Sequence, residues 1–407
     1  MQRFTDIPKS NKETNIVEIK AVTWSKDSHG LFDYENSYYD MKKFILDTTT
    51  DFYRIQNNVH SILKDVQTIE EVIGEDLIKE ANEKPEFLTS IVNDKENGLD
   101  KFYVDVSNSE NSIYKPYLII RSLKCNDGRS QRGYILKAGD KIKLGRIDYK
   151  ILEISTQNGI TNASNIINKD INSILPNHIY DGDSDSKKYQ MMKSQSSEEI
   201  LCKYCLMEKI SDDPLQNLML FICTCKEGVH FQCLKNWMQY KIITKSTSYI
   251  LSYQWKKLDC EICLTPWPRK IFFDNNIYEL ISIERPNSSY IIIERPSHEP
   301  SVFSTISVIM PTEDMQIKFG RGHQCDLRIT DISVSRVHTI LTMVKNNFIL
   351  FDNDSKFGTL IELNKNYPVL STKAAIQVGR TVFTFVQKSN TTKNNITQST
   401  VGENLIS

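Results

Sequence analysis

The sequence predicts a multidomain protein of the α+β class, and three observations lead to this prediction. The chain has 407 residues, which is long enough for two or three domains that each bury a core. Seven of its nine cysteines fall within 62 residues, between Cys202 and Cys263. After Ile271, short apolar runs alternate with turn residues without a helical run, which indicates an antiparallel β-sandwich.

The bulk composition is that of a globular protein, with 40% apolar and 25% charged residues. A net charge of -1 offers no electrostatic footprint for nucleic acid or for an anionic membrane. The first 15 residues lack the apolar core of a signal peptide, and no stretch approaches 18 uninterrupted apolar residues. We therefore expect a soluble intracellular protein, cytoplasmic or nuclear, that binds neither nucleic acid nor a membrane.

Residues 1–100 carry one strand pattern and one helical pattern. Val17–Trp24 is typical of a strand. Between Phe52 and Leu77 the apolar residues recur at spacings of three and four, as on one face of a helix. We expect a partly helical N-terminal region and assign it no function.

Residues 101–155 are predicted to form a β-rich module, because apolar residues alternate in the runs 117–123, 133–146 and 148–154. The end of this module also resembles a later segment. The residues that align without gaps are Ile142, Leu144, Gly145, Arg146, Tyr149 and Ile151, with Ile376, Val378, Gly379, Arg380, Phe383 and Phe385. Either two closing strands around a glycine turn look alike, or the module is a degenerate, truncated copy of the C-terminal domain.

Two segments are rich in Asn, Ser, Thr and Asp and poor in apolar residues. Residues 156–198 are predicted to be a flexible linker, and residues 389–407 a disordered tail. Such segments bury too little apolar surface to offset the entropy lost on ordering.

The region from Cys202 to Cys263 contains four pairs of metal ligands. The pairs are Cys202/Cys205, Cys223/Cys225, His230/Cys233 and Cys260/Cys263. Zinc prefers thiolate and imidazole ligands in a tetrahedron, and such close pairs let two side chains bind one ion. Eight ligands make two closed sites with no position left for water or substrate. We therefore predict two structural zinc ions and assign no catalytic residue.

The residues around these ligands resemble a RING-variant (RING-CH) domain, which we place at 199–272. The run His230–Trp237, HFQCLKNW, is similar to the RING-CH signature, and Cys260–Trp267, CEICLTPW, to its ending. PHD fingers share the ligand order but usually carry a Trp where Leu258 stands. Two spacings depart from the RING-CH pattern, since four residues separate Cys225 from His230 and 26 separate Cys233 from Cys260.

This resemblance implies an interleaved, cross-braced arrangement of the eight ligands. One zinc would be bound by Cys202, Cys205, His230 and Cys233, and the other by Cys223, Cys225, Cys260 and Cys263. RING-type ubiquitin ligases act by positioning a ubiquitin-conjugating enzyme. Its docking groove would here be lined by Tyr204, Trp237 and Pro266. Leu264 stands where many active RING domains have a basic residue.

The strands after residue 278 carry a second resemblance, to a forkhead-associated (FHA) domain at 278–388. It rests on Lys318–Leu341, KFGRGHQCDLRITDISVSRVHTIL, and on Asp352–Thr359, DNDSKFGT. FHA domains recognise phosphothreonine, which needs charge-assisted hydrogen bonds from a guanidinium and from hydroxyl donors. The resemblance assigns phosphopeptide binding to Arg321, Ser335, Lys356, Gly358 and Thr359. Phe357 replaces the Asn that many FHA domains place before the closing Gly-Thr, so we expect weak peptide selectivity.

Two functions of different classes are compatible with these modules. The first is a ubiquitin ligase that recruits phosphothreonine-containing proteins through its FHA domain, with a conjugating enzyme as second partner. The alternative is a non-enzymatic scaffold in which the zinc domain is structural or PHD-like. We favour the ligase because the residues flanking the ligands resemble RING-CH more closely.

Overall fold

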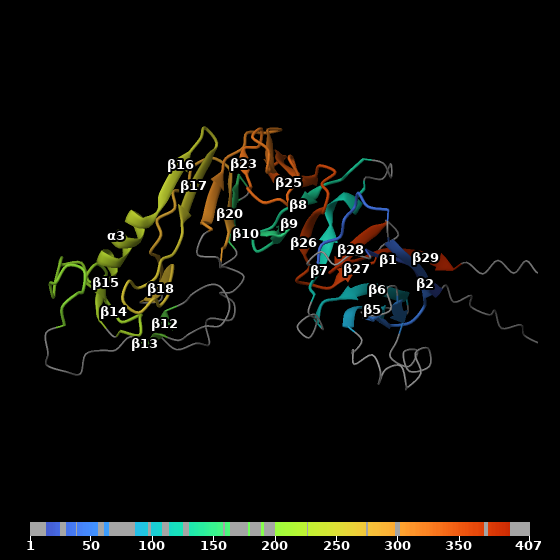
Figure 1. The fold of residues 1–407 in the computed structure, drawn as a ribbon, viewed down its shortest axis with the longest axis horizontal. Coiled ribbons are helices and arrows are strands. Elements are labelled where there is room, and N and C mark those ends of the chain that lie inside the picture. The colour runs from blue at the N-terminus through green and yellow to red at the C-terminus, as the bar shows by residue number, and fades with distance from the viewer. Residues whose placement is uncertain are drawn as a thin grey trace, which may run out of the picture. The chain divides into compact units, whose positions relative to one another are not determined.

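The chain folds into two compact units, dominated by strands (Figure 1). Unit 1 comprises Met1–Arg132 and Glu362–Ser407, and unit 2 comprises Gly133–Ile361. The computed structural model describes residues 14–24, 30–37, 39–55, 61–64, 86–96, 99–107, 114–124, 130–157, 159–162, 178–179, 189–190, 200–225, 227–273, 276–297, 302–369 and 373–390.

Unit 2 contains a sandwich of two sheets. One sheet has the strand order β21-β20-β10-β9-β26 and the other β23-β22-β24-β25-β8. The strands of the first are β21 (Ser304–Ile309), β20 (Tyr290–Arg295), β10 (Ile147–Thr156), β9 (Lys141–Leu144) and β26 (Thr359–Glu362). Those of the second are β23 (Leu327–Arg328), β22 (Gln316–Gly320), β24 (Thr339–Val344), β25 (Asn347–Asp352) and β8 (Tyr134–Ile135). Alternate residues such as Ile317, Phe319, Leu341 and Leu350 are buried, as two facing sheets require.

Unit 1 repeats this strand order with other segments of the chain. Its sheets are β2-β1-β29-β28-β7 and β4-β3-β5-β6-β27. The first comprises β2 (Tyr39–Leu46), β1 (Thr14–Trp24), β29 (Thr381–Asn390), β28 (Ala374–Val378) and β7 (Pro116–Ile119). The second comprises β4 (Ser61–Lys64), β3 (Thr50–Ile55), β5 (Glu86–Glu96), β6 (Leu99–Asp105) and β27 (Tyr367–Pro368).

Each sandwich therefore takes its closing hairpin from the other half of the sequence. In unit 2, β9 and β10 pair around the turn Gly145–Arg146, and β10 pairs with β20. In unit 1, β28 and β29 pair around Gly379–Arg380, and β29 pairs with β1. Both glycines have positive φ, at 60° and 55°, which only glycine adopts without steric cost. The residues that align in the sequence thus occupy the same place in two sandwiches.

The FHA boundaries of 278–388 stay a prediction, and they include residues of both units. Residues 362–388 belong to unit 1, and the hairpin at 141–156 stands in their place in unit 2. The two hairpins have the same Gly-Arg turn and the same pattern of apolar residues. Either hairpin can therefore pair with the open edge of β1 or of β20. All the short runs predicted as strands between Tyr290 and Gln387 do form strands.

The helix predicted from Phe52 onward is wrong for the part of that segment that the structure describes. Residues 50–55 form β3 and residues 61–64 form β4, while residues 65–85 lie outside the described ranges. Phe52 and Arg54 are both buried, as alternate residues of a strand. The second of these buried residues, Arg54, is charged and pairs with Glu86. The apolar residues alone therefore do not show the alternation that is typical of a strand.

The segment at 156–198 also contains more structure than predicted. Strand β11 (Gly159–Asn162) pairs with β10, and β12 (His178–Ile179) pairs with β13 (Tyr189–Gln190). Its other residues from 163 to 199 lie outside the described ranges, as does the tail beyond Asn390. Within the described ranges, no helix is both long and apolar enough to cross a membrane.

The cysteine-rich region, residues 200–273 of unit 2, forms what we call the cysteine module. Its helix α3 (Phe231–Lys241) contains the predicted run from Phe231 to Trp237, and His230 directly precedes it. Phe231, Leu234 and Met238 recur on one buried face of this helix. Its short strands are β14 (Met219–Leu220), β15 (Val229–His230), β16 (Ile243–Ser246), β17 (Ile250–Trp255) and β18 (Lys270–Phe273), which pairs with β19 (Asn276–Glu279).

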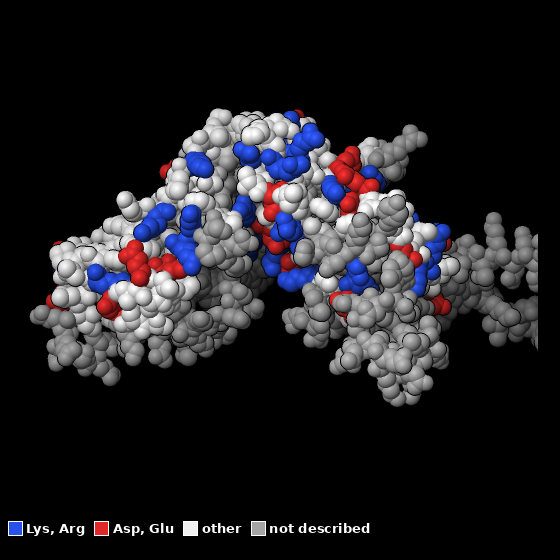
Figure 2. Space-filling model, in the orientation of Figure 1, with Lys and Arg blue, Asp and Glu red and all other residues white. Residues whose placement is uncertain are grey.

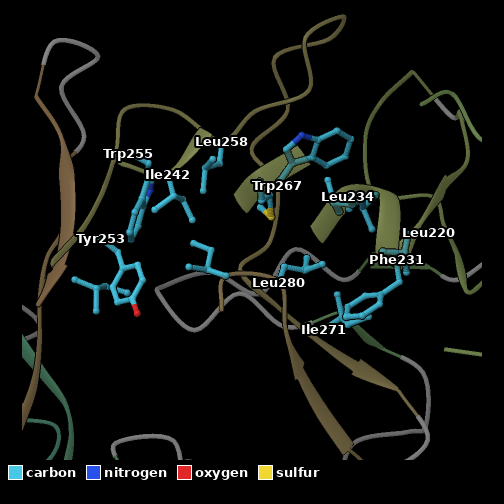
Figure 3. Close-up of a cluster of buried hydrophobic side chains, with 14 of the residues drawn as sticks. Leu220, Phe231, Leu234, Ile242, Tyr253, Trp255, Leu258, Trp267, Ile271 and Leu280 are labelled. Atoms are coloured by element: carbon cyan, nitrogen blue, oxygen red, sulfur yellow. The ribbon is translucent and has the colours of Figure 1, made fainter. Parts of the chain in front are cut away.

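The long interval between Cys233 and Cys260 contains the hairpin β16–β17, and this hairpin joins the cysteine module to the sandwich. Strand β17 pairs antiparallel with β21 from Ile250↔Ile309 to Trp255↔Ser304. One hydrophobic cluster contains Leu234 of α3 and Trp255 of β17 (Figure 3). Ile292 of β20 belongs to the same cluster. Strand β20 is therefore buried on both faces, which explains its unbroken run YIII.

Candidate functional sites

The eight predicted metal ligands come together in two groups of four. Cys202, Cys205, His230 and Cys233 form one group, and Cys223, Cys225, Cys260 and Cys263 form the other. Within each group the ligand atoms all lie within 4.8 Å of one another. This is the interleaved pairing expected from the RING-CH resemblance, and each group is a complete tetrahedral donor set.

Two matching turns present the ligands. Leu206 N–H donates to Cys202 O at 2.8 Å, and Leu264 N–H donates to Cys260 O at 2.9 Å. Both leucines have positive φ, at 57° and 56°. The same backbone path thus brings each Cys-x-x-Cys pair onto one side of a turn and leaves the leucine side chain exposed, at 72% and 69%.

His230 is oriented for metal binding by its second nitrogen. Nε2 lies 3.0 Å from Glu208 O, and because a carbonyl only accepts, Nε2 carries the proton. Nδ1 is then a free acceptor, 3.3 Å from Cys205 Sγ and 3.8 Å from Cys233 Sγ. A carbonyl that fixes the tautomer is the usual outer partner of a histidine ligand.

The second group consists of four cysteines, and one of its sulfur pairs has the spacing of a zinc site. Cys225 Sγ lies 3.7 Å from Cys260 Sγ, close to the ~3.8 Å that a tetrahedron of 2.3 Å zinc–sulfur bonds requires. Cys223 and Cys225 are closer, at 2.8 Å. Hydrogen bonds from Thr224 and Thr265 lower the pKa of Cys263 to about 4, and Lys203 Nζ donates to Cys260 Sγ at 3.1 Å. The residues present fit a soft cation such as zinc.

Of the three predicted docking residues, Tyr204 lies within the first ligand turn, Trp237 on α3 and Pro266 after the last ligand. The rings of Tyr204 and Trp237 stack, with centroids 6.0 Å apart and planes inclined by 18°. Trp237 also meets the buried Trp267 edge-on, at 6.5 Å. Tyr204 and Trp237 are half-buried, whereas Pro266 is exposed. Trp237 therefore has both a packed side and an accessible side.

At one end of the sandwich, three loops meet through backbone contacts. Arg321 N–H donates to Ser335 O at 3.0 Å, and Gly322 N–H donates to Arg336 O at 2.9 Å. A Cβ on Gly320 would lie 2.4 Å from Arg336 O, so only glycine allows this approach. The loop at 321–326 is thus locked to the loop at 329–338.

His338 connects these loops to the third, at 353–358. Its Nδ1 accepts a hydrogen bond from Ser335 N–H at 3.1 Å, so Nε2 is protonated and donates to Gly358 O at 3.0 Å. His338 is fully buried and packs between the loops. Ser335 Oγ accepts a hydrogen bond from Lys356 N–H at 3.0 Å.

The predicted binding residues divide into two layers. Arg321 and Lys356 are exposed and Ser335 is half-buried, so all three are accessible. Gly358 and Thr359 are buried beneath them. Gly358 has φ at 75°, and Thr359 Oγ1 donates to Asp352 Oδ1 at 2.7 Å. These two residues shape the loop rather than line its surface.

The surface of these loops is basic. Figure 2 shows Lys and Arg side chains gathered over β23 and β25. The exposed ones in this region are Arg321, Arg328, Arg336 and Lys356. Among the residues that the structure describes, none forms a hydrogen bond or ion pair with the Arg321 guanidinium. An exposed guanidinium beside a serine hydroxyl is well suited to a phosphate.

The hairpin turn at Gly145 lies against the far side of the loop at 329–338. Arg146 N–H donates to Ser333 Oγ at 2.9 Å, and its guanidinium lies 3.5 Å from Asp331. Burial opposes ionisation of Asp331, but the hydrogen bonds from Ser333 and the charge of Arg146 hold its pKa below the usual value. The loop that carries Ser335 is therefore held from both sides.

Comparison with known protein families identifies the domain that contains the loops at 321–326, 329–338 and 353–358, which we call the FHA loops. The FHA domain family matches residues 317–382. FHA domains bind phosphothreonine-containing proteins, so the FHA match implies phosphothreonine-peptide binding. No family match covers Cys202–Cys263, and no curated protein or solved structure matches the chain.

The FHA match spans parts of two folded units. It runs from Ile317 through β22–β26 of unit 2 and continues into β27–β29 of unit 1. In unit 2, β8–β10 occupy the corresponding places. Gly145, Arg146 and Asp352 therefore contribute to the loops although sequence reasoning did not select them. The Gly-Arg pair that recurs at 145 and 379 was the sequence signal for Gly145 and Arg146. For Asp352 the signal was a carboxylate before the closing Gly-Thr.

Proposed function

We propose that this chain is a RING-type ubiquitin ligase that recruits phosphothreonine-containing proteins through its FHA loops. The observation that carries the proposal is the pair of interleaved four-ligand groups, together with the stacking of Tyr204 on Trp237. In this proposal each group holds one structural zinc ion, and zinc supplies only the cross-links that hold the module together.

The surface of the cysteine module supports a protein partner. Leu206, Ile262 and Leu264 project from the two ligand turns and are 72%, 65% and 69% exposed. Exposed apolar side chains concentrated on one small module are typical of a contact surface. We propose that a conjugating enzyme docks on Tyr204, Trp237 and Pro266, flanked by these side chains, and that the module acts by positioning.

The FHA loops supply the recognition chemistry for a phosphothreonine. Arg321 provides the guanidinium and Ser335 the hydroxyl, with Lys356 beside them. Hydrogen bonds of this charged kind contribute about 1.5–3 kcal/mol each. Since β17 pairs with β21, the cysteine module is joined to one sheet of the same sandwich whose loops carry these residues.

For unit 1 we propose a second, FHA-like sandwich that does not bind phosphate. Its strand order matches that of unit 2. Arg54 lies at the end of β3, the strand that corresponds to β22, but it is 4% exposed and donates to Glu86 at 2.6 Å. The guanidinium of Arg54 is thus already paired with a buried carboxylate.

Leu264 favours a second candidate function, the non-enzymatic scaffold. It is exposed on the last ligand turn, where a basic residue is common in active RING domains, and a leucine offers ubiquitin no charged contact. In that case the module is a structural or PHD-like domain, and the FHA loops are the recognition element.

An autoubiquitination assay of the full chain with a panel of conjugating enzymes decides between the two. Transfer with at least one enzyme, lost on chelation of the metal, supports the ligase. Absence of transfer with every enzyme, from protein that binds phosphothreonine peptides, selects the scaffold. A degenerate phosphothreonine peptide library tests the recognition step separately.

A further inference from the structure

A side chain of the cysteine module contacts one of the FHA loops. Tyr249 lies in the turn between β16 and β17, and its hydroxyl donates a hydrogen bond to Asp326 Oδ1. Asp326 ends the loop at 321–326, which begins with Arg321. The contact therefore joins a residue between two metal ligands, Cys233 and Cys260, to the loop with the phosphate-binding guanidinium.

Asp326 is the residue that closes this loop. Its Oδ2 accepts a hydrogen bond from Lys318 N–H at 2.7 Å, and its own N–H donates to Lys318 O at 2.9 Å. Cys325 N–H donates to Gly322 O at 3.2 Å within the loop. The carboxylate therefore fastens the end of the loop to β22, and Tyr249 is its contact outside the FHA strands.

The turn that carries Tyr249 is itself well held. Met310 N–H donates to Tyr249 O at 2.8 Å, which extends the β17–β21 pairing past Ile250. Thr247 Oγ1 accepts a hydrogen bond from Ile250 N–H at 3.0 Å and closes the turn. The hydrogen bond to Asp326 raises the pKa of Tyr249, so its hydroxyl stays protonated and continues to donate.

We propose that Tyr249 is a positioning residue for phosphothreonine binding, which holds the loop at 321–326 in its binding conformation through Asp326. This inference rests on the proposed phosphopeptide function of the FHA loops. A loop that is already ordered loses less conformational entropy when the ligand binds, so affinity increases without a new contact to the ligand. The cysteine module thereby contributes to substrate recognition.

The test compares Tyr249→Phe with Tyr240→Phe in the full chain. Tyr240 is a matched control, since it belongs to the same module but is 87% exposed on α3. The probe is a fluorescein-labelled phosphothreonine peptide that the unmodified chain selects from a degenerate library. We expect Tyr249→Phe to weaken binding by about three- to tenfold, in keeping with the net contribution of one intramolecular hydrogen bond, and Tyr240→Phe to leave it unchanged.

Two further measurements separate positioning from general stability. Hydrogen exchange of the Gly322, Cys325 and Asp326 amides should accelerate in Tyr249→Phe at an unchanged thermal transition. In an Asp326→Ala background, Tyr249→Phe should have no additional effect, because the two residues act as a pair. Unchanged binding and exchange in Tyr249→Phe overturn the proposal, as does a loss of binding that only follows a fall in the thermal transition.

Failure of the proposed phosphopeptide function would give a different result from failure of the Tyr249 proposal. If the unmodified chain shows no phosphate-dependent binding, the FHA function is refuted. The exchange of the loop amides in Tyr249→Phe then still decides whether Tyr249 holds the loop.

Discussion

Tyr204 and Trp237 stack with ring centroids 6.0 Å apart, although they belong to a ligand turn and to α3, respectively. Neither residue is a metal ligand, so the pair can be altered without removing a cross-link. A substitution in this pair therefore tests the docking hypothesis without removing a ligand that stabilises the module.

Trp237→Ala should abolish ubiquitin transfer while the metal content stays at two ions per chain. Truncation of a central aromatic at an interface commonly costs about 2 kcal/mol or more. Tyr240→Ala on the same helix is the control, since Tyr240 projects into solvent. Transfer that survives Trp237→Ala would contradict the docking model, and loss of folding would give Trp237 a structural role.

Elemental analysis should find two zinc ions per chain, and chelation should unfold the cysteine module. A structural zinc site contributes an apparent ~10–16 kcal/mol, which the small core around α3 does not replace. Because β17 lies between two ligands and pairs with β21, its amides should also lose protection from exchange. Cys325→Ser should leave the metal content unchanged, and finding one ion or none in folded protein would refute the interleaved sites.

Arg321→Ala should weaken phosphothreonine-peptide binding at least tenfold without changing the thermal transition. The guanidinium is exposed and serves the ligand, so its loss removes about 1.5–3 kcal/mol of binding but no core contact. Lys345→Ala is a control for charge alone, since Lys345 lies in the turn between β24 and β25 at the opposite end of the strands. Equal effects of the two changes would assign the binding to net charge.

Two glycine substitutions test which hairpin serves the FHA loops. A Cβ on Gly145 would lie 2.4 Å from Ser333 Oγ and 2.7 Å from its carbonyl, so Gly145→Ala should displace this loop and weaken phosphopeptide binding. Gly379→Ala makes the same change in the same turn, but its Cβ would meet Tyr114 of unit 1 at 3.0 Å. It should leave phosphopeptide binding intact. The opposite result would place residues 374–390 in the FHA sandwich.

The sequence predicted the parts of the fold that local patterns specify. Alternation of apolar residues identified β20–β26, and ligand spacing together with the RING-CH resemblance identified the partners of His230. The helix at Phe52 failed because the buried residue next in the strand is Arg54, whose burial depends on Glu86, 32 residues away.

The parts that could not be predicted depend on long-range pairing. The turns at Gly145 and Gly379 carry the same residues, so nothing local decides which sandwich each hairpin completes. The contact of Tyr249 with Asp326 likewise follows from the register of β17 on β21, which becomes known only when the two modules are seen together. Arg321 and Ser335 were predictable because one short stretch contains both.

The pairing of β1 with β29 also governs the order in which the protein can be completed during synthesis. A ribosome synthesises β1 long before β29. Throughout that interval β1 has β2 on one side and an open hydrogen-bonding edge on the other, from Thr14 to Thr23. The first sandwich therefore remains unfinished until β29 has been synthesised, and a nascent chain truncated before Ala374 exposes the strand edge that a second chain can pair with.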